Sequence, residues 1–229
     1  MDYKIDLHVH SNTNPHVFST IKENADYAAE TGMKVIAITN HGPALEDTPH
    51  WWQLINIRIV PEYIVGETGE LDINQSIYRL MDIILAGFHG NHLYPKNQDR
   101  EKNTRAAVNL IKSQKADVLV HLGNPEFPID YELVAKTAKE YNVALELNNS
   151  SLGGTRKGSE KTCRELAKFA KKYGCYICIN TDSHYCAQIG DTPLAGEIAE
   201  EINYPQELIL NSSEDVLYKF LELRKALRP

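Results

Sequence analysis

Several histidines of the chain stand at the ends of short apolar runs, where their spacing could bind a metal ion. The first such run closes on His8-Val9-His10. Successive side chains of a β-strand point to opposite faces, so His8 and His10 share a face and can reach one ion, while Val9 points into packing. Taken alone, a histidine pair of this kind is more often polar surface or a hydrogen-bonded core position.

Further histidines follow the same pattern, and together they favour a metal site. Strand-length apolar runs lead into His41, His89 and His121, and another leads into Asp182-Ser183-His184, where a carboxylate and an imidazole again have the i, i+2 spacing. Of nine histidines, six lie in or just after such runs. Neutral imidazoles with a few carboxylates suit zinc, iron or manganese better than calcium or magnesium, which prefer all-oxygen shells.

The apolar runs alternate with amphipathic helical patterns along the whole chain. They predict strands near 4–10, 35–40, 59–67, 83–89, 118–123, 144–150 and 176–182. Helices are predicted near 20–31, 104–114, 130–142, 159–173, 194–202 and 213–227. Repeated strand-helix units imply parallel strands with right-handed crossovers, so the expected fold class is α/β.

The distribution of the candidate ligands favours a barrel over an open sheet. They would come from five different strands, and a closed or distorted β/α barrel gathers the carboxyl ends of its strands on one rim. The strand ends of a doubly wound open sheet, the alternative, spread along a line and would not form one cluster. We therefore predict a single barrel domain over residues 1–229, a common length for one domain.

Charge and hydropathy exclude some classes of partner. A net charge of −7 argues against a general nucleic-acid surface, but it leaves room for one phosphate-bearing substrate if bound cations reverse the local field. The first residues lack the apolar core of a signal peptide, and no run approaches the roughly 18 apolar residues of a membrane span. We expect a soluble, cytoplasmic protein with no membrane partner and no stable nucleic-acid partner.

The four cysteines do not form a metal site in this interpretation. Cys175 and Cys178 enter a predicted strand, where residues three apart face opposite ways and cannot chelate one ion. We expect small buried thiols in a reducing compartment.

The ordered set of motifs resembles the PHP (polymerase and histidinol phosphatase) family of metal-dependent phosphoesterases, most closely its small bacterial single-domain phosphatase branch. The matching segments are 6–11, 37–43, 86–89, 121–125, 146–151 with 156–159, and 181–184. The resemblance spans nearly the whole chain. It implies a distorted barrel of seven strands, up to three zinc ions with manganese or iron as alternatives, and a homo-oligomer such as a trimer.

The resemblance also implies a ligand set, in which His16 gains a role that its loop position alone would not suggest. The first ion would be bound by His8, His10, Asp182 and a bridging glutamate, the second by that glutamate with His89 and His121, and the third by His16, His41 and His184.

The bridging glutamate is the point at which this chain departs from the family. A carboxylate is needed there because two neighbouring cations repel strongly unless an anion lies between them. Family members carry Gly-x-Glu, whereas Gly66-Glu67 lacks the intervening residue. We favour Glu67, with Glu62 or Glu70 as substitutes and loss of the bridge as a further alternative.

Together these expectations predict that the protein is a phosphatase that hydrolyses a phosphate monoester of a small metabolite or nucleotide. Three divalent ions less two carboxylates leave a formal charge of about +4, which attracts a polyanion, and a metal-bound hydroxide would be the nucleophile. Asp182 and His184 would act first as ligands. Arg156 and Lys157 precede a helix expected from Ser159, and cations beside a helix N-terminus form a natural phosphate site.

Three other functions stay open on the sequence. A nuclease or phosphodiesterase of PHP type would share the metal chemistry. A metal-dependent amidohydrolase also uses His-x-His on its first strand, but it typically needs a bridging lysine and a longer chain. A regulatory module with a weakened metal site would explain the shortened glutamate segment.

Overall fold

The computed structural model describes residues 2–42, 62–64, 66, 68–71, 80–90 and 94–229, and it confirms the predicted alternation of strands and helices. The strands are β1 (Ile5–Val9), β2 (Val35–Ile38), β3 (Glu62–Ile64), β4 (Leu85–Gly87), β5 (Val118–Leu119), β6 (Ala144–Asn148) and β7 (Ile177–Asn180). The α-helices are α1 (Ile21–Glu30), α4 (Arg100–Ser113), α5 (Tyr131–Tyr141), α6 (Ser159–Tyr173), α7 (Pro193–Glu201) and α8 (Glu214–Leu227). Short helical turns occupy Ser151–Thr155, Cys186–Gln188 and Gln206–Leu208.

The strands form two parallel sheets that meet at β1 and β7. One sheet has the order β3-β4-β5-β6-β7, and the other pairs β1 with β2. A parallel bridge joins Val9 to Ser183 just beyond β7, and the amide of His10 donates to the carbonyl of Ser183 at 2.9 Å. The strands thus follow one another in barrel order, which confirms the predicted distorted α/β barrel. Among the described residues no ladder joins β2 to β3, so closure at that seam is not detected.

Side-chain caps explain where the helices begin. Thr20 and Glu23 form a capping box at α1, and Ser213 caps α8 by accepting from the amide of Val216. Helix α4 begins earlier than the sequence pattern predicts, because Asp99 accepts from the amide of Lys102 and so satisfies a free donor of the first turn. No helix in the described part of the chain is both long and apolar enough to cross a membrane.

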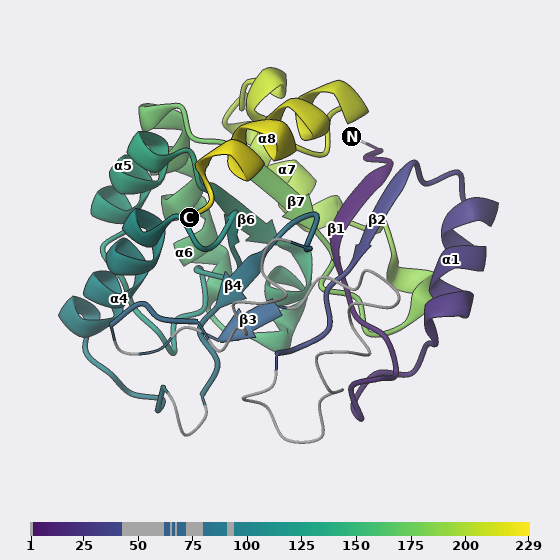
Figure 1. Ribbon diagram of the computed structural model, residues 1–229, viewed down its shortest axis with the longest axis horizontal. Helices are drawn as coiled ribbons and strands as arrows, with labels where there is room; N and C mark the ends of the chain where they lie inside the picture. Colours follow the sequence, from purple (N-terminus) through teal and green to yellow (C-terminus); the bar gives the residue numbers. More distant parts are fainter. Residues whose placement is uncertain (1, 43–61, 65, 67, 72–79, 91–93) are drawn as a thin grey trace.

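Two apolar clusters build the core around the strands. The larger one lies between the five-stranded sheet and helices α4 to α7, of which α4, α5 and α6 lie side by side along one flank (Figure 1). The smaller cluster joins the first residues of the strands, including Ile5, Val118 and Ala144, to Leu217 and Phe220 of α8. Helix α8 therefore covers the end of the strands opposite their carboxyl ends (Figure 1).

A buried ion pair fastens α8 to that end. The Arg224 guanidinium and the Asp117 carboxylate are both fully buried, and Arg224 Nε donates to Asp117 Oδ1 at 3.1 Å. Arg224 also donates to the carbonyl oxygens of Ala116 and Tyr141, and Arg228 donates to the other oxygen of Asp117. These bonds satisfy both charges, which burial would otherwise make costly.

Removal of this guanidinium should lower the stability of the fold. We expect Arg224→Ala to lower the free energy of unfolding by about 3 to 5 kcal/mol, because it leaves a buried carboxylate short of donors. Neighbouring Lys225 is half-exposed and pairs with Asp82, so Lys225→Ala should change stability by less than about 1 kcal/mol. Urea denaturation of the two variants checks this, and equal effects would contradict the assigned role of Arg224.

Candidate metal centre

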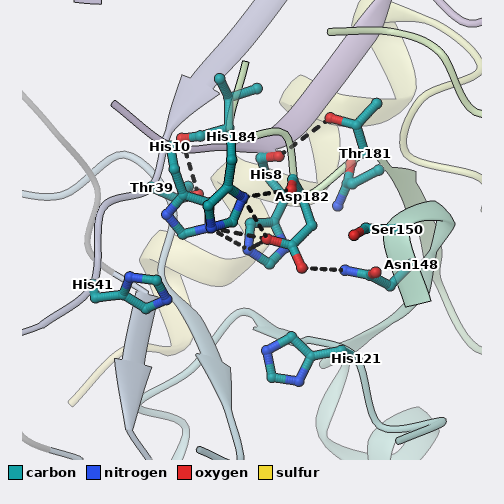
Figure 2. A network of polar contacts seen from close by, with 12 residues as sticks. His8, His10, Thr39, His41, His121, Asn148, Ser150, Thr181, Asp182 and His184 are labelled. Carbon is teal, nitrogen blue, oxygen red and sulfur yellow. Dashed lines mark hydrogen bonds and ion pairs between the residues drawn. The ribbon is translucent and has the colours of Figure 1, made fainter. Parts of the chain in front are cut away.

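The histidines singled out in the sequence meet at the carboxyl ends of the strands. Their rings form one continuous cluster, in which neighbouring ring centroids lie between 4.6 and 6.2 Å apart. The cluster consists of His8, His10, His16, His41, His89, His121 and His184. Figure 2 shows five of these rings around the carboxylate of Asp182. The predicted convergence is therefore found, whereas the role of each histidine as a ligand stays a prediction.

Three of these side chains place their ligand atoms at coordination spacing. His8 Nε2 and His10 Nε2 are 3.1 Å apart, and Asp182 Oδ1 lies 3.1 Å from His10 Nε2 and 3.4 Å from His8 Nε2. A tetrahedral ion with bonds of about 2.0 to 2.1 Å separates its ligand atoms by roughly 3.3 Å. The three atoms are thus already arranged as one face of such a shell, and the donor set fits zinc.

A second carboxylate, Glu146 of β6, orients the His8 ring by contacting its Nδ1 atom, on the side away from His10. Glu146 is fully buried, and its Oε1 lies 2.8 Å from His8 Nδ1. An ionised carboxylate can only accept, so His8 carries its proton on Nδ1 and presents the lone pair of Nε2 to the centre. Carboxylates in this position fix the ring and raise the basicity of metal-binding histidines.

Glu146 also reaches the other strands of the rim. Its Oε2 accepts from the amide of His121 at 2.8 Å, and its Oε1 accepts from the Asn180 side chain at 2.9 Å. Asn148 Nδ2 donates both to Glu146, at 3.0 Å, and to Asp182 Oδ2, at 3.2 Å. One network therefore connects β1, β5, β6 and β7 below the histidines.

Sequence reasoning assigned no role to Glu146 or Asn148, although a signal was present. The two polar residues alternate with Leu145 and Leu147 inside an otherwise apolar strand, the same i, i+2 pattern that singled out His8 and His10.

Both buried carboxylates are held in their charged form. Burial alone would raise the pKa of Asp182, but His8, His10 and Arg156 outweigh it and hold the pKa well below its usual range. Burial likewise opposes the charge of Glu146, yet His8, His121 and Asn180 lower its pKa. Both groups are therefore ionised at neutral pH. The charge lets Asp182 bind a cation and lets Glu146 accept the Nδ1 proton of His8.

The backbone at two site residues is unusual. Asp182 has φ of 56° and His121 has φ of 38°, in the left-handed region that residues other than glycine rarely adopt. Asp6 supports the first of these turns, because its carboxylate accepts from the hydroxyl of Thr181 at 2.5 Å and from the amide of Gly190 at 3.1 Å. Strain of this kind persists only where surrounding contacts fix it, and it is common at functional sites.

A glycine makes room for His121. A Cβ added at Gly87, the last residue of β4, would lie 2.4 Å from His121 Cε1 and 2.8 Å from its Nε2. The imidazole of one strand end thus lies directly over the backbone of the next.

The candidates for the bridging glutamate have different outcomes. Glu67 lies outside the described residues, so its role stays a prediction. Glu62 belongs to β3, where its Cα pairs with Leu85. Glu70 is exposed, and its carboxylate accepts from the amide of Thr68 at 2.8 Å within its own turn.

Arg156 enters the site, whereas Lys157 stays at the surface. Arg156 Nη1 donates to Asp182 Oδ2 at 3.1 Å and to Ser151 Oγ at 2.9 Å. The guanidinium lines a cavity of about 540 Å³ that also borders His89, Asp182 and His184. Lys157 is exposed just before α6. Three of the cysteines are buried free thiols, as predicted, and Cys186 is half-buried.

Comparison with known proteins agrees with this fold. No family model matches the chain. The histidinol phosphate phosphatase of Lactococcus lactis, solved with zinc, L-histidinol and phosphate, has a similar fold, with a TM-score of 0.63, 16% identity, and coverage of 89% of this chain and 95% of that chain. A chain of an archaeal ribonuclease P solved with mature tRNA has a TM-score of 0.53 at 16% identity, covering 97% and 92%. The fold is that of the PHP histidinol phosphatases.

Closer relatives exist in sequence. A protein named "Probable phosphatase" from Tolumonas auensis is 38% identical over 98% of this chain and 96% of its own length. One from Shewanella halifaxensis bears the same name and is 40% identical over 98% of this chain and 94% of its own length. The chain belongs to this family of bacterial PHP proteins.

A methyl group at Gly87 should disturb the centre. We expect Gly87→Ala to push the His121 ring aside and to lower the zinc content of the purified protein, measured by mass spectrometry after dialysis. Gly153 has open space around its Cβ position, so Gly153→Ala should retain the zinc content of the unmodified protein. Full zinc content in Gly87→Ala would contradict the prediction that the close approach of Gly87 and His121 is needed for metal binding.

Neutralising the carboxylate behind His8 should weaken metal binding without emptying the site. We expect Glu146→Gln to raise the zinc dissociation constant by about 10- to 100-fold, as loss of such a partner typically does. Glu132→Gln serves as the control, because Glu132 lies on α5 and pairs with Lys172. Competition titration with a chelator measures both variants, and an unchanged constant in Glu146→Gln would contradict the orienting role.

Proposed function

We propose that the protein is a metal-dependent phosphatase that hydrolyses phosphate monoesters of small molecules. One observation carries this proposal: the ligand atoms of His8, His10 and Asp182 lie at coordination spacing. Other histidines of the cluster lie next to them. The names of the close relatives support the reaction class, and the zinc and phosphate in the Lactococcus neighbour support the chemistry.

The proposed centre holds up to three ions, with zinc as the first choice and manganese or iron(II) as alternatives. Zinc accepts mixed imidazole and carboxylate shells of the kind that these strand ends offer. We retain Glu67 as the proposed bridge. The ligands are His8, His10 and Asp182 for the first ion, His89 and His121 for the second, and His16, His41 and His184 for the third, with Glu67 between the first two.

Bound divalent ions would supply Lewis acidity, by neutralising phosphate charge and lowering the pKa of water. The residues of the chain provide the rest. Asp182, kept ionised by its neighbours, contributes negative charge to the centre, and Glu146 holds the proton of His8 on Nδ1.

Arg156 is the proposed phosphate-binding residue. The contacts of its guanidinium with described residues use Nη1, whereas the group carries five N–H donors in a planar fork. The remaining donors can therefore bind phosphate oxygens in the cavity.

We also propose that residues 1–229 form one domain, that the protein works in the cytoplasm, and that it assembles as a homo-oligomer such as a trimer. Its partner is a small phosphate ester, without a stable nucleic-acid partner. Light scattering of the purified protein tests the assembly.

Loss of a proposed ligand should abolish phosphate release while the fold persists. We expect His10→Ala and Asp182→Asn to lower kcat for 4-nitrophenyl phosphate by more than about 100-fold. Loss of a residue that only hydrogen-bonds to a metal ligand typically costs about 10- to 100-fold, and loss of a ligand should cost more. Chelation should remove the activity of the unmodified protein, and zinc or manganese should restore it. Circular dichroism controls for folding. Activity that survives both substitutions would overturn the proposal, and equal turnover of a phosphodiester would favour a nuclease.

A further inference from the structure

Two aromatic side chains stand exposed beside the candidate metal centre. Phe18 is 82% exposed and Tyr185 is 52% exposed, although most aromatic residues of the described chain are buried or half-buried. Both line the cavity of about 540 Å³ that contains Asp182 and Arg156. Covering exposed apolar surface is favourable, by about 25 cal/mol per Å² of apolar area removed from water. A ligand that covers the two rings would therefore be stabilised.

The backbone fixes the two aromatic residues to the site. The amide of Phe18 donates to the carbonyl of His184 at 2.9 Å, so the loop that carries His16 is bonded to the loop that carries Tyr185. The imidazoles of His16 and His184 are 5.1 Å apart between their centroids. Each aromatic residue therefore follows a histidine of the cluster by one or two positions. A phosphate ester held at the centre would have its alcohol portion beside these rings.

The cavity suits a small organic molecule in size and in lining. Its volume falls within the range of about 300 to 1,000 Å³ that is usual for small-molecule sites. Phe88 and Phe127, whose rings stack at 5.6 Å, form a buried apolar part of the lining, and Lys96 and Asn124 add polar groups. Lys96 already pairs with Glu126 at 3.1 Å, and Asn124 accepts from the amide of Glu126, so this side of the cavity is polar without a ligand. A long aliphatic chain would take water from these groups without offering them a hydrogen bond, whereas a heteroaromatic ring has faces for stacking and edges for hydrogen bonds.

We infer that Phe18 and Tyr185 form a subsite for the planar heteroaromatic base of the leaving group, and that the substrate class is a nucleoside monophosphate. This inference rests on the proposed phosphatase function. In the reaction, the oxygen of water forms a new bond to phosphorus, the bond from phosphorus to the ester oxygen breaks, and the alcohol leaves with a proton. The products are the free nucleoside and inorganic phosphate.

Stacking of one base on aromatic side chains contributes about 1 to 3 kcal/mol, which corresponds to roughly 5- to 150-fold in kcat/KM. The test compares adenosine 5′-monophosphate with ribose 5-phosphate on the metal-loaded protein. Both release a primary alcohol of the same sugar, so the base is the main difference between them. We expect the nucleotide to be preferred by about tenfold or more. Phe18→Ala and Tyr185→Ala should each reduce this ratio.

Tyr218→Ala is the matched control, because Tyr218 lies on α8 away from this cavity and is 50% exposed. It should keep the full ratio. Equal kcat/KM for the two esters, or a ratio that persists in both aromatic variants, would overturn the inference. A change of oligomeric state in Phe18→Ala without a change in the ratio would also overturn the inference. In that case the Phe18 ring would serve a contact between copies of the chain.

Failure of the subsite can be told apart from failure of the proposed function. If the subsite is wrong, ribose 5-phosphate and 4-nitrophenyl phosphate still release phosphate, but without a preference that depends on Phe18 or Tyr185. If the function is wrong, none of the three esters releases phosphate from the metal-loaded protein.

Discussion

The centre depends on one buried charge, the carboxylate of Glu146, which has no access to water. A carboxylate in that position is stable only when donors surround it, and its donors come from four strands: His8 on β1, the amide of His121 after β5, Asn148 on β6 and Asn180 on β7. The bonds to His8 and to the amide of His121 fix two residues of the histidine cluster, and Asn148 also donates to Asp182. The buried charge of Glu146 is therefore stable only while these strands keep the arrangement that positions the site residues.

The two ends of the barrel perform different tasks with similar chemistry. At the end covered by α8, Asp117 and Arg224 neutralise each other, so this network is closed and serves stability. At the opposite rim the side chains are mostly imidazoles and carboxylates, and the ligand atoms of His8, His10 and Asp182 lie at mutual distances that suit an ion. The rim also carries the strained backbone of His121 and Asp182. Stability and candidate function are thus separated along the strands, as is usual in β/α barrels.

Much of this arrangement could be predicted from the sequence, because strand alternation and the convergence of barrel strands depend on local patterns. These two rules brought His8, His10, His41, His89, His121 and His184 together, and family resemblance added His16. Other features depend on distant contacts. Glu146 orients His8 across 138 positions of sequence, a pairing that no local pattern reveals. Strand β5 is shorter than predicted, because the amide of His121 turns away from the ladder to Glu146.

The most direct test is a crystal structure of the protein grown with zinc, with anomalous diffraction recorded on both sides of the zinc absorption edge. The account predicts two or three anomalous peaks within the histidine cluster, one of them bonded to His8 Nε2, His10 Nε2 and Asp182 Oδ1. The Nδ1 atom of His8 should remain hydrogen-bonded to Glu146. A cluster without an anomalous peak, or zinc bound only elsewhere on the chain, would contradict the central claim.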